Sequence, residues 1–185
     1  MENKYKSWIE GFGRVVDKQL GIEIKKKVLD QCENCQNISN DKKMVQCTKE
    51  VMLKFDQTVP DNIKRENVMR SLGNACFNNF FVKIAEKVKK KSKGIEEIIQ
   101  NINYASGAEQ FKLEKNNNIN ATFNHCLCPI GVSETEEPIL KTYCNCSLGW
   151  MKSLFNILID SSVKVELLES ITSGGKSCHF IIKLS

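Results

Sequence analysis

Apolar residues in the first half of the chain recur every three or four positions, the spacing that gathers them on one face of an α-helix. The first such run starts at Trp8 and continues through Phe12 and Val16. Because glycine is a poor helix former, Gly73 is a point at which the fourth helix is expected to be interrupted. The same period predicts further helices within residues 22–29, 44–55, 60–73, 74–91 and 94–105.

Near residue 108 the apolar period changes to strict alternation, which is typical of a β-strand. Phe111 and Leu113 alternate with polar residues, and a second alternating run covers residues 119–123. The Asn-rich segment 115–118 lies between the two runs as a turn, so this part of the chain predicts a β-hairpin.

The last third of the chain predicts one helix followed by a second hairpin. The helix lies within residues 147–159, and the two strands lie within 162–172 and 178–185 on either side of a Gly-containing turn. The order of elements indicates an α+β fold, with N-terminal helices packed on a twisted antiparallel sheet made of two hairpins separated by a helix.

The domain organisation follows from the same change of pattern. We expect a helical region over residues 1–107 and a sheet region over 108–185 that carries the cysteine cluster. The sheet region is expected to form one compact domain with residues 60–107. At 185 residues, the chain has room for one domain with a proper core.

The composition is that of a soluble globular protein, 41% hydrophobic and 26% charged. The longest apolar runs are far shorter than the ~20 residues that a membrane-spanning helix needs. The N-terminal residues are polar and lack an apolar signal core. We therefore expect a cytoplasmic protein, in which reduced cysteines serve as metal ligands or reactive thiols more often than as disulfides.

The net charge of +5 comes largely from short lysine runs. The densest, within residues 87–94, ends a predicted helix, where lysines oppose the helix dipole favourably. These runs lack interleaved aromatic residues, so the pattern favours a solvated basic surface over a nucleic-acid site.

Four of the nine cysteines form two Cys-x-Cys pairs, Cys126 with Cys128 and Cys144 with Cys146. In extended backbone both sulfurs of such a pair lie on the same face. If the loop between the pairs brings them together, they make a four-thiolate metal site, for which zinc is the first expectation. Cys178 is a competing ligand. An iron–sulfur cluster, redox or disulfide pairing, and inert buried thiols remain alternatives.

Three further groups extend this set. Cys32 and Cys35 form a Cys-x2-Cys pair that predicts a second, weaker metal site. His125 directly precedes Cys126 and can act as a ligand or as a general base. His179 follows Cys178 on a predicted strand, so it should point to the opposite face of the sheet.

The C-terminal segment resembles the C-terminal half of the 4-vinyl-reductase-type domain, a small-molecule-binding module of archaea and bacteria. A Cys opens a helix containing Gly and aromatic residues, a Val-rich strand and a Gly turn follow, and the last strand begins with Cys, a polar residue and Phe. These features are Cys144, Gly149, Trp150, Val163, Val165, Gly174, Cys178, His179 and Phe180.

This resemblance implies a twisted antiparallel sheet packed on helices around an apolar pocket, often in a homodimer. The implied ligand is an apolar or aromatic small molecule. The expected pocket-lining residues are Phe77, Phe80, Phe81, Phe111 and Trp150.

Some members of that family carry a zinc site, and this sequence matches it in part. Cys144 and Cys178 correspond to its first and last ligands. The two middle positions hold Ser170 and Leu167 instead of a Cys and an acidic residue. Cys126, Cys128 and Cys146 are additional thiols that can replace them.

Enzymatic function is the alternative class. The chain has no Gly-rich phosphate loop, no His-Glu-x-x-His and no Gly-x-Ser-x-Gly. The C-terminal hairpin is also similar in style to the aminothiazoline-carboxylate hydrolase family. A thiol-dependent hydrolase would use Cys146 as nucleophile and His125 as base. An iron–sulfur or redox protein is a third reading.

Overall fold

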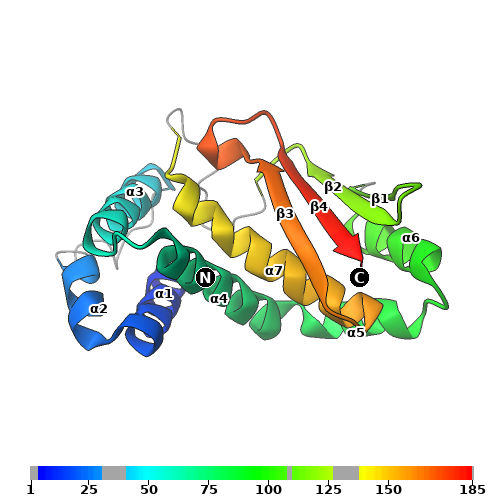
Figure 1. The fold of residues 1–185 in the computed structure, drawn as a ribbon, viewed down its shortest axis with the longest axis horizontal. Coiled ribbons are helices and arrows are strands. Elements are labelled where there is room, and N and C mark those ends of the chain that lie inside the picture. The colour runs from blue at the N-terminus through cyan, green and yellow to red at the C-terminus, as the bar shows by residue number, and fades with distance from the viewer. Residues whose placement is uncertain (1–3, 31–40, 108–109, 127–137, 185) are drawn as a thin grey trace.

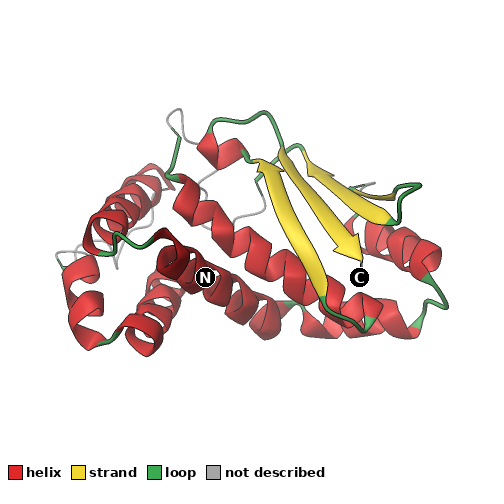
Figure 2. Cartoon of the chain, viewed as in Figure 1, coloured by secondary structure: helices red, strands yellow, loops and turns green. Residues whose placement is uncertain are grey.

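The computed structural model of the protein describes residues 4–30, 41–107, 110–126 and 138–184 (Figure 1). Seven α-helices are formed by these residues: α1 (Lys4–Leu20), α2 (Ile22–Leu29), α3 (Asp41–Thr58), α4 (Asn62–Phe80), α5 (Val82–Lys90), α6 (Ile95–Ser106) and α7 (Lys141–Ile159). Helices α1 to α3 gather at one end of the molecule and the sheet lies at the other, with α4 and α7 running between them (Figure 2). None of these helices is long and apolar enough to cross a membrane.

Four strands form one antiparallel sheet in the order β1-β2-β4-β3. They are β1 (Phe111–Leu113), β2 (Asn118–Phe123), β3 (Val163–Glu169) and β4 (Cys178–Leu184), with a short 3₁₀ helix, η3 (Ile171–Ser173), between the last two. Each hairpin is local in sequence, and the β2–β4 pairing joins the two hairpins into one sheet. The predicted α+β class, with two hairpins separated by a helix, is confirmed.

The inner face of the sheet packs on α5, α6 and α7. Phe111 and Phe123 alternate with polar neighbours along their strands, as the period-2 pattern requires, and Phe180 lies between His179 and Ile181; all three rings are buried. Their rings meet edge to face, and Phe111 also contacts Phe155 of α7 in this way. The aromatic rings therefore fill the space between sheet and helices.

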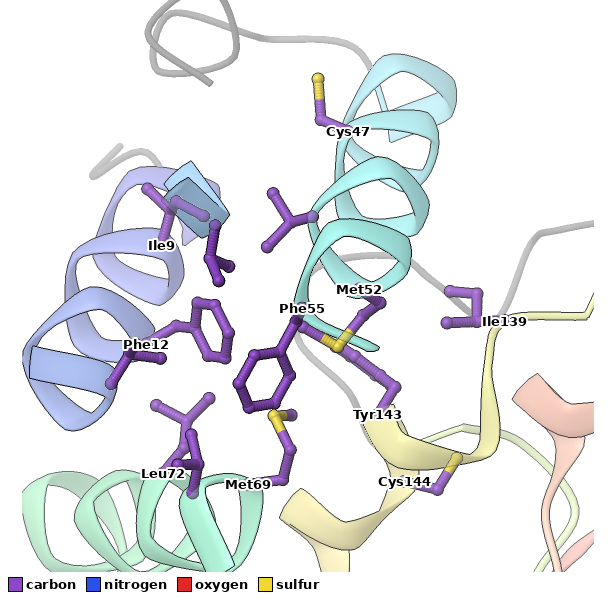
Figure 3. Packing of buried hydrophobic residues seen from close by; sticks show 14 of the residues in the cluster. Ile9, Phe12, Cys47, Met52, Phe55, Met69, Leu72, Ile139, Tyr143 and Cys144 are labelled. Carbon is purple, nitrogen blue, oxygen red and sulfur yellow. The ribbon is translucent and has the colours of Figure 1, made fainter. Parts of the chain in front are cut away.

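A second core lies among α1, α2, α3, α4 and the start of α7 (Figure 3). Phe12 stacks on Trp8 and meets Phe55 edge to face, and the Tyr143 ring of α7 contacts the Trp8 ring. Helices α4 and α7 contribute residues to both cores, so they connect the helical end to the sheet.

Two glycines set the crossing of α4 and α7. A Cβ on Gly73 would overlap the backbone carbonyl of Cys146, and a Cβ on Gly149 would overlap the backbone of Arg70. The two helices therefore touch backbone to backbone, at a distance that no other residue type allows. Gly73 does not interrupt α4, contrary to the sequence-based expectation, because it is needed at this contact.

Two helix boundaries differ from those expected. A helix break occurs at Phe81, where the sequence predicts one continuous helix over residues 74–91; its φ of −119° and ψ of −13° separate α4 from α5. The other difference is that α7 begins at Lys141 and not near residue 147. Cys144 and Cys146 therefore lie inside a helix, so the extended backbone expected there is wrong.

Candidate functional site

Cysteine thiols from three segments approach the turn that joins β3 to β4. Cys178 is the first residue of β4, and Phe123, its partner on β2, lies three residues before Cys126. This register brings the two cysteines together, and the Cys126 side chain forms a hydrogen bond with the Cys178 sulfur. Both residues are partly buried.

The environment of Cys178 favours its thiolate. The hydrogen bond from Cys126 has the largest effect, and together with one from the backbone N–H of Ile171 it lowers the pKa of Cys178 from 9.0 to about 7. Burial and the negative charge of Glu169 oppose this shift. A thiolate stabilised by two donors is both a soft metal ligand and a nucleophile near neutral pH.

Cys144 lies beside the same turn but faces its hydroxyl groups. Its buried sulfur is 3.2 Å from Ser170 Oγ, 2.6 Å from Thr172 Oγ1 and 3.8 Å from Ser173 Oγ. The segment 170–173 thus contacts Cys144 through its side chains and Cys178 through the backbone of Ile171. Ser170 occupies the position where the 4-vinyl-reductase resemblance places a zinc-binding Cys.

The turn that holds these thiols is fixed by backbone and carboxylate hydrogen bonds. The carboxylate of Glu169 accepts from the backbone N–H of Lys176 and from Ser177 Oγ, each at 2.9 Å. These two bonds lower the pKa of the Glu169 carboxyl group. At its other side, the N–H of Ile139 donates to the carbonyl of Thr172 at 2.6 Å, which joins the turn to the residues before α7.

The start of α7 is anchored from the helical end of the molecule. Thr142 Oγ1 donates to Asp56 Oδ2 at 3.1 Å, and Asp56 Oδ1 pairs with Arg65 Nε at 3.2 Å. This half-buried pair joins the ends of α3 and α4 to α7, so Cys144 is held by contacts that the cysteine pattern does not show.

The remaining predicted ligands are distributed differently. Cys144 and Cys146 are ~200° apart around α7, since each helical residue turns by ~100°. Cys146 therefore does not share the direction of Cys144, and its carbonyl faces Gly73. Cys128 lies outside the described residues, as do Cys32 and Cys35.

The two other described cysteines are not part of this group. Burial raises the pKa of the Cys76 thiol, which is typical of an unreactive residue near a core. Cys47 is disulfide-bonded, although reduced thiols were the first expectation and disulfide pairing an alternative. Within the described ranges, no three His, Cys, Asp or Glu side chains are close enough together to hold a metal ion.

Neither histidine joins the thiols as a predicted ligand or base would. His125 is exposed in the segment after β2. His179 Nε2 lies 3.5 Å from Asn120 Oδ1 on the outer face of the sheet, opposite Cys178 as the strand alternation predicts.

Of the predicted pocket residues, Phe77 and Phe111 are buried in the sheet core and Trp150 packs against it. Trp150 meets the rings of both Phe77 and Phe81 edge to face. Phe80 is 68% exposed on the surface. The apolar pocket itself stays a prediction.

The hydroxyl groups beside Cys144 were not predicted from the sequence. Ser170, Thr172 and Ser173 form a polar run just before the Gly turn, and Ser170 and Thr172 are buried, which polar side chains seldom are without a partner. Their signal was the resemblance, which placed a ligand at residue 170. The Asp56–Thr142 contact has no comparable signal, since 86 residues separate its partners.

Comparisons with known proteins bear on the fold and on the family. Two crystal structures of an H-NOX protein from S. oneidensis are similar to this chain, one in the Fe(II)NO ligation state and one a mutant in the Fe(II) state. The first gives a TM-score of 0.51 over 97% of this chain and 98% of that chain, and the second gives 0.52 over 97% and 95%; both are 14% identical in sequence. At this identity the likeness shows a shared fold.

No curated protein sequence matches the chain. The sequence model of a family described as a family of unknown function (DUF6144) matches residues 12–185.

Proposed function

The chain belongs to that family of unknown function, and on this premise we propose that it is a small-molecule-binding domain in which Cys126 and Cys178 hold a thiophilic metal ion, zinc in the first instance. The observation that carries the proposal is the contact between these two thiols, with the pKa of Cys178 lowered to about 7. Zinc binds thiolates, and a ligand that is already ionised near neutral pH binds it with little competition from protons.

Two further cysteines are proposed to complete the four ligands. Cys128 is two residues from Cys126 along the chain. Cys144 contacts the same segment, 170–173, that donates to Cys178. Its hydrogen bonds to Thr172 and Ser170 would have to be exchanged for a bond to the metal. The Ile171 N–H would remain as a donor to the Cys178 sulfur, a type of contact that orients thiolate ligands.

The iron in the neighbouring H-NOX structures does not transfer to this chain. An iron cofactor of that kind is commonly held by a protein side chain, often His, that faces an open volume. Here both histidines are on the outer surface, His125 exposed and His179 beside Asn120. The layer between sheet and helices is filled by the rings around Phe111 and Phe155. The described residues therefore do not fit such a group.

Metal content of protein purified anaerobically, with an absorbance spectrum, tests the proposal. We expect about one equivalent of zinc and no visible colour. Cys126→Ser and Cys178→Ser should each lose the metal, because each removes one of the two contacting thiols. Cys76→Ser is the matched control and should keep it, since Cys76 lies on α4 away from the turn.

If the protein instead contains iron with charge-transfer absorption, the cofactor is the iron–sulfur cluster and not zinc. Equal zinc in the wild type and in both site variants would contradict the proposal.

A thiol-redox function is the second candidate, favoured by the same pair of thiols and by the disulfide at Cys47. The Cys178 thiolate would attack a small-molecule disulfide, and Cys126 would then displace the second thiol. The protein loses two electrons and two protons, and the reagent is reduced to two thiols. Metal-free protein that forms the Cys126–Cys178 disulfide in this way would favour this function over metal binding.

The small molecule and the assembly are proposed from the 4-vinyl-reductase resemblance. They are an apolar or aromatic ligand and a homodimer, in a cytoplasmic protein. The edge-to-face cluster of Phe77, Phe81 and Trp150 supports an aromatic ligand, because its outer ring, Phe81, is 38% exposed.

A further inference from the structure

A basic and apolar surface lies at the junction of α4 and α5, on the lower edge of the molecule in Figure 1 and apart from the thiol site. Its apolar part consists of Phe80, Phe81 and Ile84, which are 68%, 38% and 47% exposed. Large apolar side chains that are exposed next to one another usually form a binding site for a membrane, a ligand or a partner protein. We call these residues, with the exposed lysines that follow, the α5 surface.

The lysines of the α5 surface are Lys83, Lys87, Lys90, Lys91 and Lys93. All five are exposed, and in the described part of the chain none forms a salt bridge. Lys89 is different, because its Nζ pairs with Asp160 Oδ1 at 3.0 Å. Residues 80–93 contain six lysines and one glutamate, so their formal charge of +5 equals that of the whole chain.

Apolar and basic groups lie next to one another on this surface. Lys83 and Lys87 are four residues apart on α5, as are Lys87 and Lys91 at its end, which places each pair on neighbouring turns. Phe80 and Phe81 directly precede α5 at the helix break. The opposite face of α5 is buried in the core through Ala85 and Val88. The buried face of α5 therefore attaches the helix to the core, and its other face exposes lysines and the apolar side chain of Ile84 to solvent.

We propose that the α5 surface binds anionic lipid membranes peripherally. Phe80 and Ile84 would enter the boundary between head groups and acyl chains, and the lysines would lie among anionic head groups. Exposed Phe and Ile side chains beside a cluster of lysines are the combination by which helices lie in the lipid interface, so the surface is assigned to a membrane. The proposal does not depend on the thiol site.

Sedimentation with lipid vesicles tests the proposal. The full-length protein should bind vesicles that contain phosphatidylserine, should not bind pure phosphatidylcholine vesicles, and should dissociate as salt is raised. The double variant K83E/K87E should weaken binding by at least about thirtyfold, because every basic residue at an anionic membrane surface contributes about fivefold. Phe80→Ser should weaken binding without changing its salt dependence.

Matched controls separate this surface from general charge and hydrophobicity. K26E/K27E changes the net charge equally on exposed residues of α2, and Ile63→Ser removes an apolar side chain that is 70% exposed on α4. Both should bind vesicles nearly as the wild type does, and so should Cys126→Ser. The substituted lysines, Phe80 and Ile63 are exposed, whereas Cys126 is partly buried against the helical core. Thermal melting of each variant checks that it is folded.

Three results would overturn the proposal. The first is no binding to anionic vesicles, and the second is equal loss of binding in K26E/K27E and K83E/K87E. The third is K83E/K87E releasing a single-stranded oligonucleotide or an acidic peptide while vesicle binding is unchanged, which would assign the surface to that partner.

Discussion

The chemistry of each cysteine depends on which donors surround its sulfur, more than on its neighbours in sequence. Cys178 receives two hydrogen bonds and its pKa falls to about 7, whereas burial raises the pKa of Cys76. The Cys-x-Cys pattern predicts metal ligands in this region, and that assignment stays a prediction. It could not predict that Cys178 pairs with Cys126, because that contact follows from the register of β2 against β4.

The lowered pKa of Cys178 predicts its reactivity in metal-free, reduced protein. Alkylation of Cys178 by iodoacetamide should rise with pH around a midpoint near 7, well below that of Cys76, because the thiolate is the nucleophile. Cys126→Ala should move the midpoint upward, since it removes the hydrogen-bond donor that is the main cause of the shift. Peptide mass spectrometry after timed alkylation at several pH values measures both. An unchanged midpoint in Cys126→Ala would contradict the assignment.

At the scale of elements, periodicity predicted the α-helices and the strands but not the short η3 helix, and it misplaced the α4–α5 boundary and the start of α7. Residues 141–146 combine Lys, Thr, Tyr, Cys and Asn, mostly weak helix formers, and no side chain caps the start of α7. Contacts with residues that are distant in the sequence stabilise this first turn. They are the Thr142–Asp56 hydrogen bond and the packing of Tyr143 on Trp8. Local propensity contains no information about such partners.

The Phe81 break has a comparable origin. The sequence Phe-Phe-Val combines aromatic and β-branched residues, which favour helices only weakly. The Phe81 ring packs on Trp150 of α7, and the chain turns there into α5. Helical periodicity on both sides of residue 81 conceals this change of direction.

The α4–α7 crossing gives a sharp prediction for stability. Gly73→Ala and Gly149→Ala should each lower the free energy of unfolding by more than about 3 kcal/mol, because the new methyl group overlaps backbone atoms that cannot move aside. Gly94→Ala is the matched control, since a Cβ there meets nothing and its φ is −165°. Chemical denaturation followed by circular dichroism measures all three. A crossing that tolerated both alanines would show that the helices are not in backbone contact.

At the scale of the whole molecule, two cores share two long helices. The helical core and the sheet core both include residues of α4 and α7, so neither can lose its packing without disturbing the other. The sequence predicts a helical region and a sheet region. It does not predict that α4 and α7 contribute to both cores, because periodicity shows that a helix has an apolar face but not which residues cover it.

This sharing predicts one cooperative unfolding transition, which the two tryptophans can report separately. Trp8 packs against the helical core and Trp150 against the sheet core. In the Trp8→Phe variant, Trp150 is the one remaining tryptophan. Adding Phe12→Ala in the helical core should lower the free energy of unfolding that Trp150 fluorescence reports by about 3–5 kcal/mol. Fluorescence and circular dichroism should give the same midpoint. A Trp150 curve unaffected by Phe12→Ala would mean that the cores unfold independently.

The position of β4 in the sheet has a consequence for synthesis on the ribosome. This strand lies between β2 and β3 yet is translated after both. Until it emerges from the exit tunnel, the nascent chain carries a finished first hairpin and a β3 strand with no partner, and such edges are prone to pair wrongly. Because Cys178 begins β4, the thiol pair with Cys126 forms only when this last strand enters the sheet, so the site matures at the end of folding.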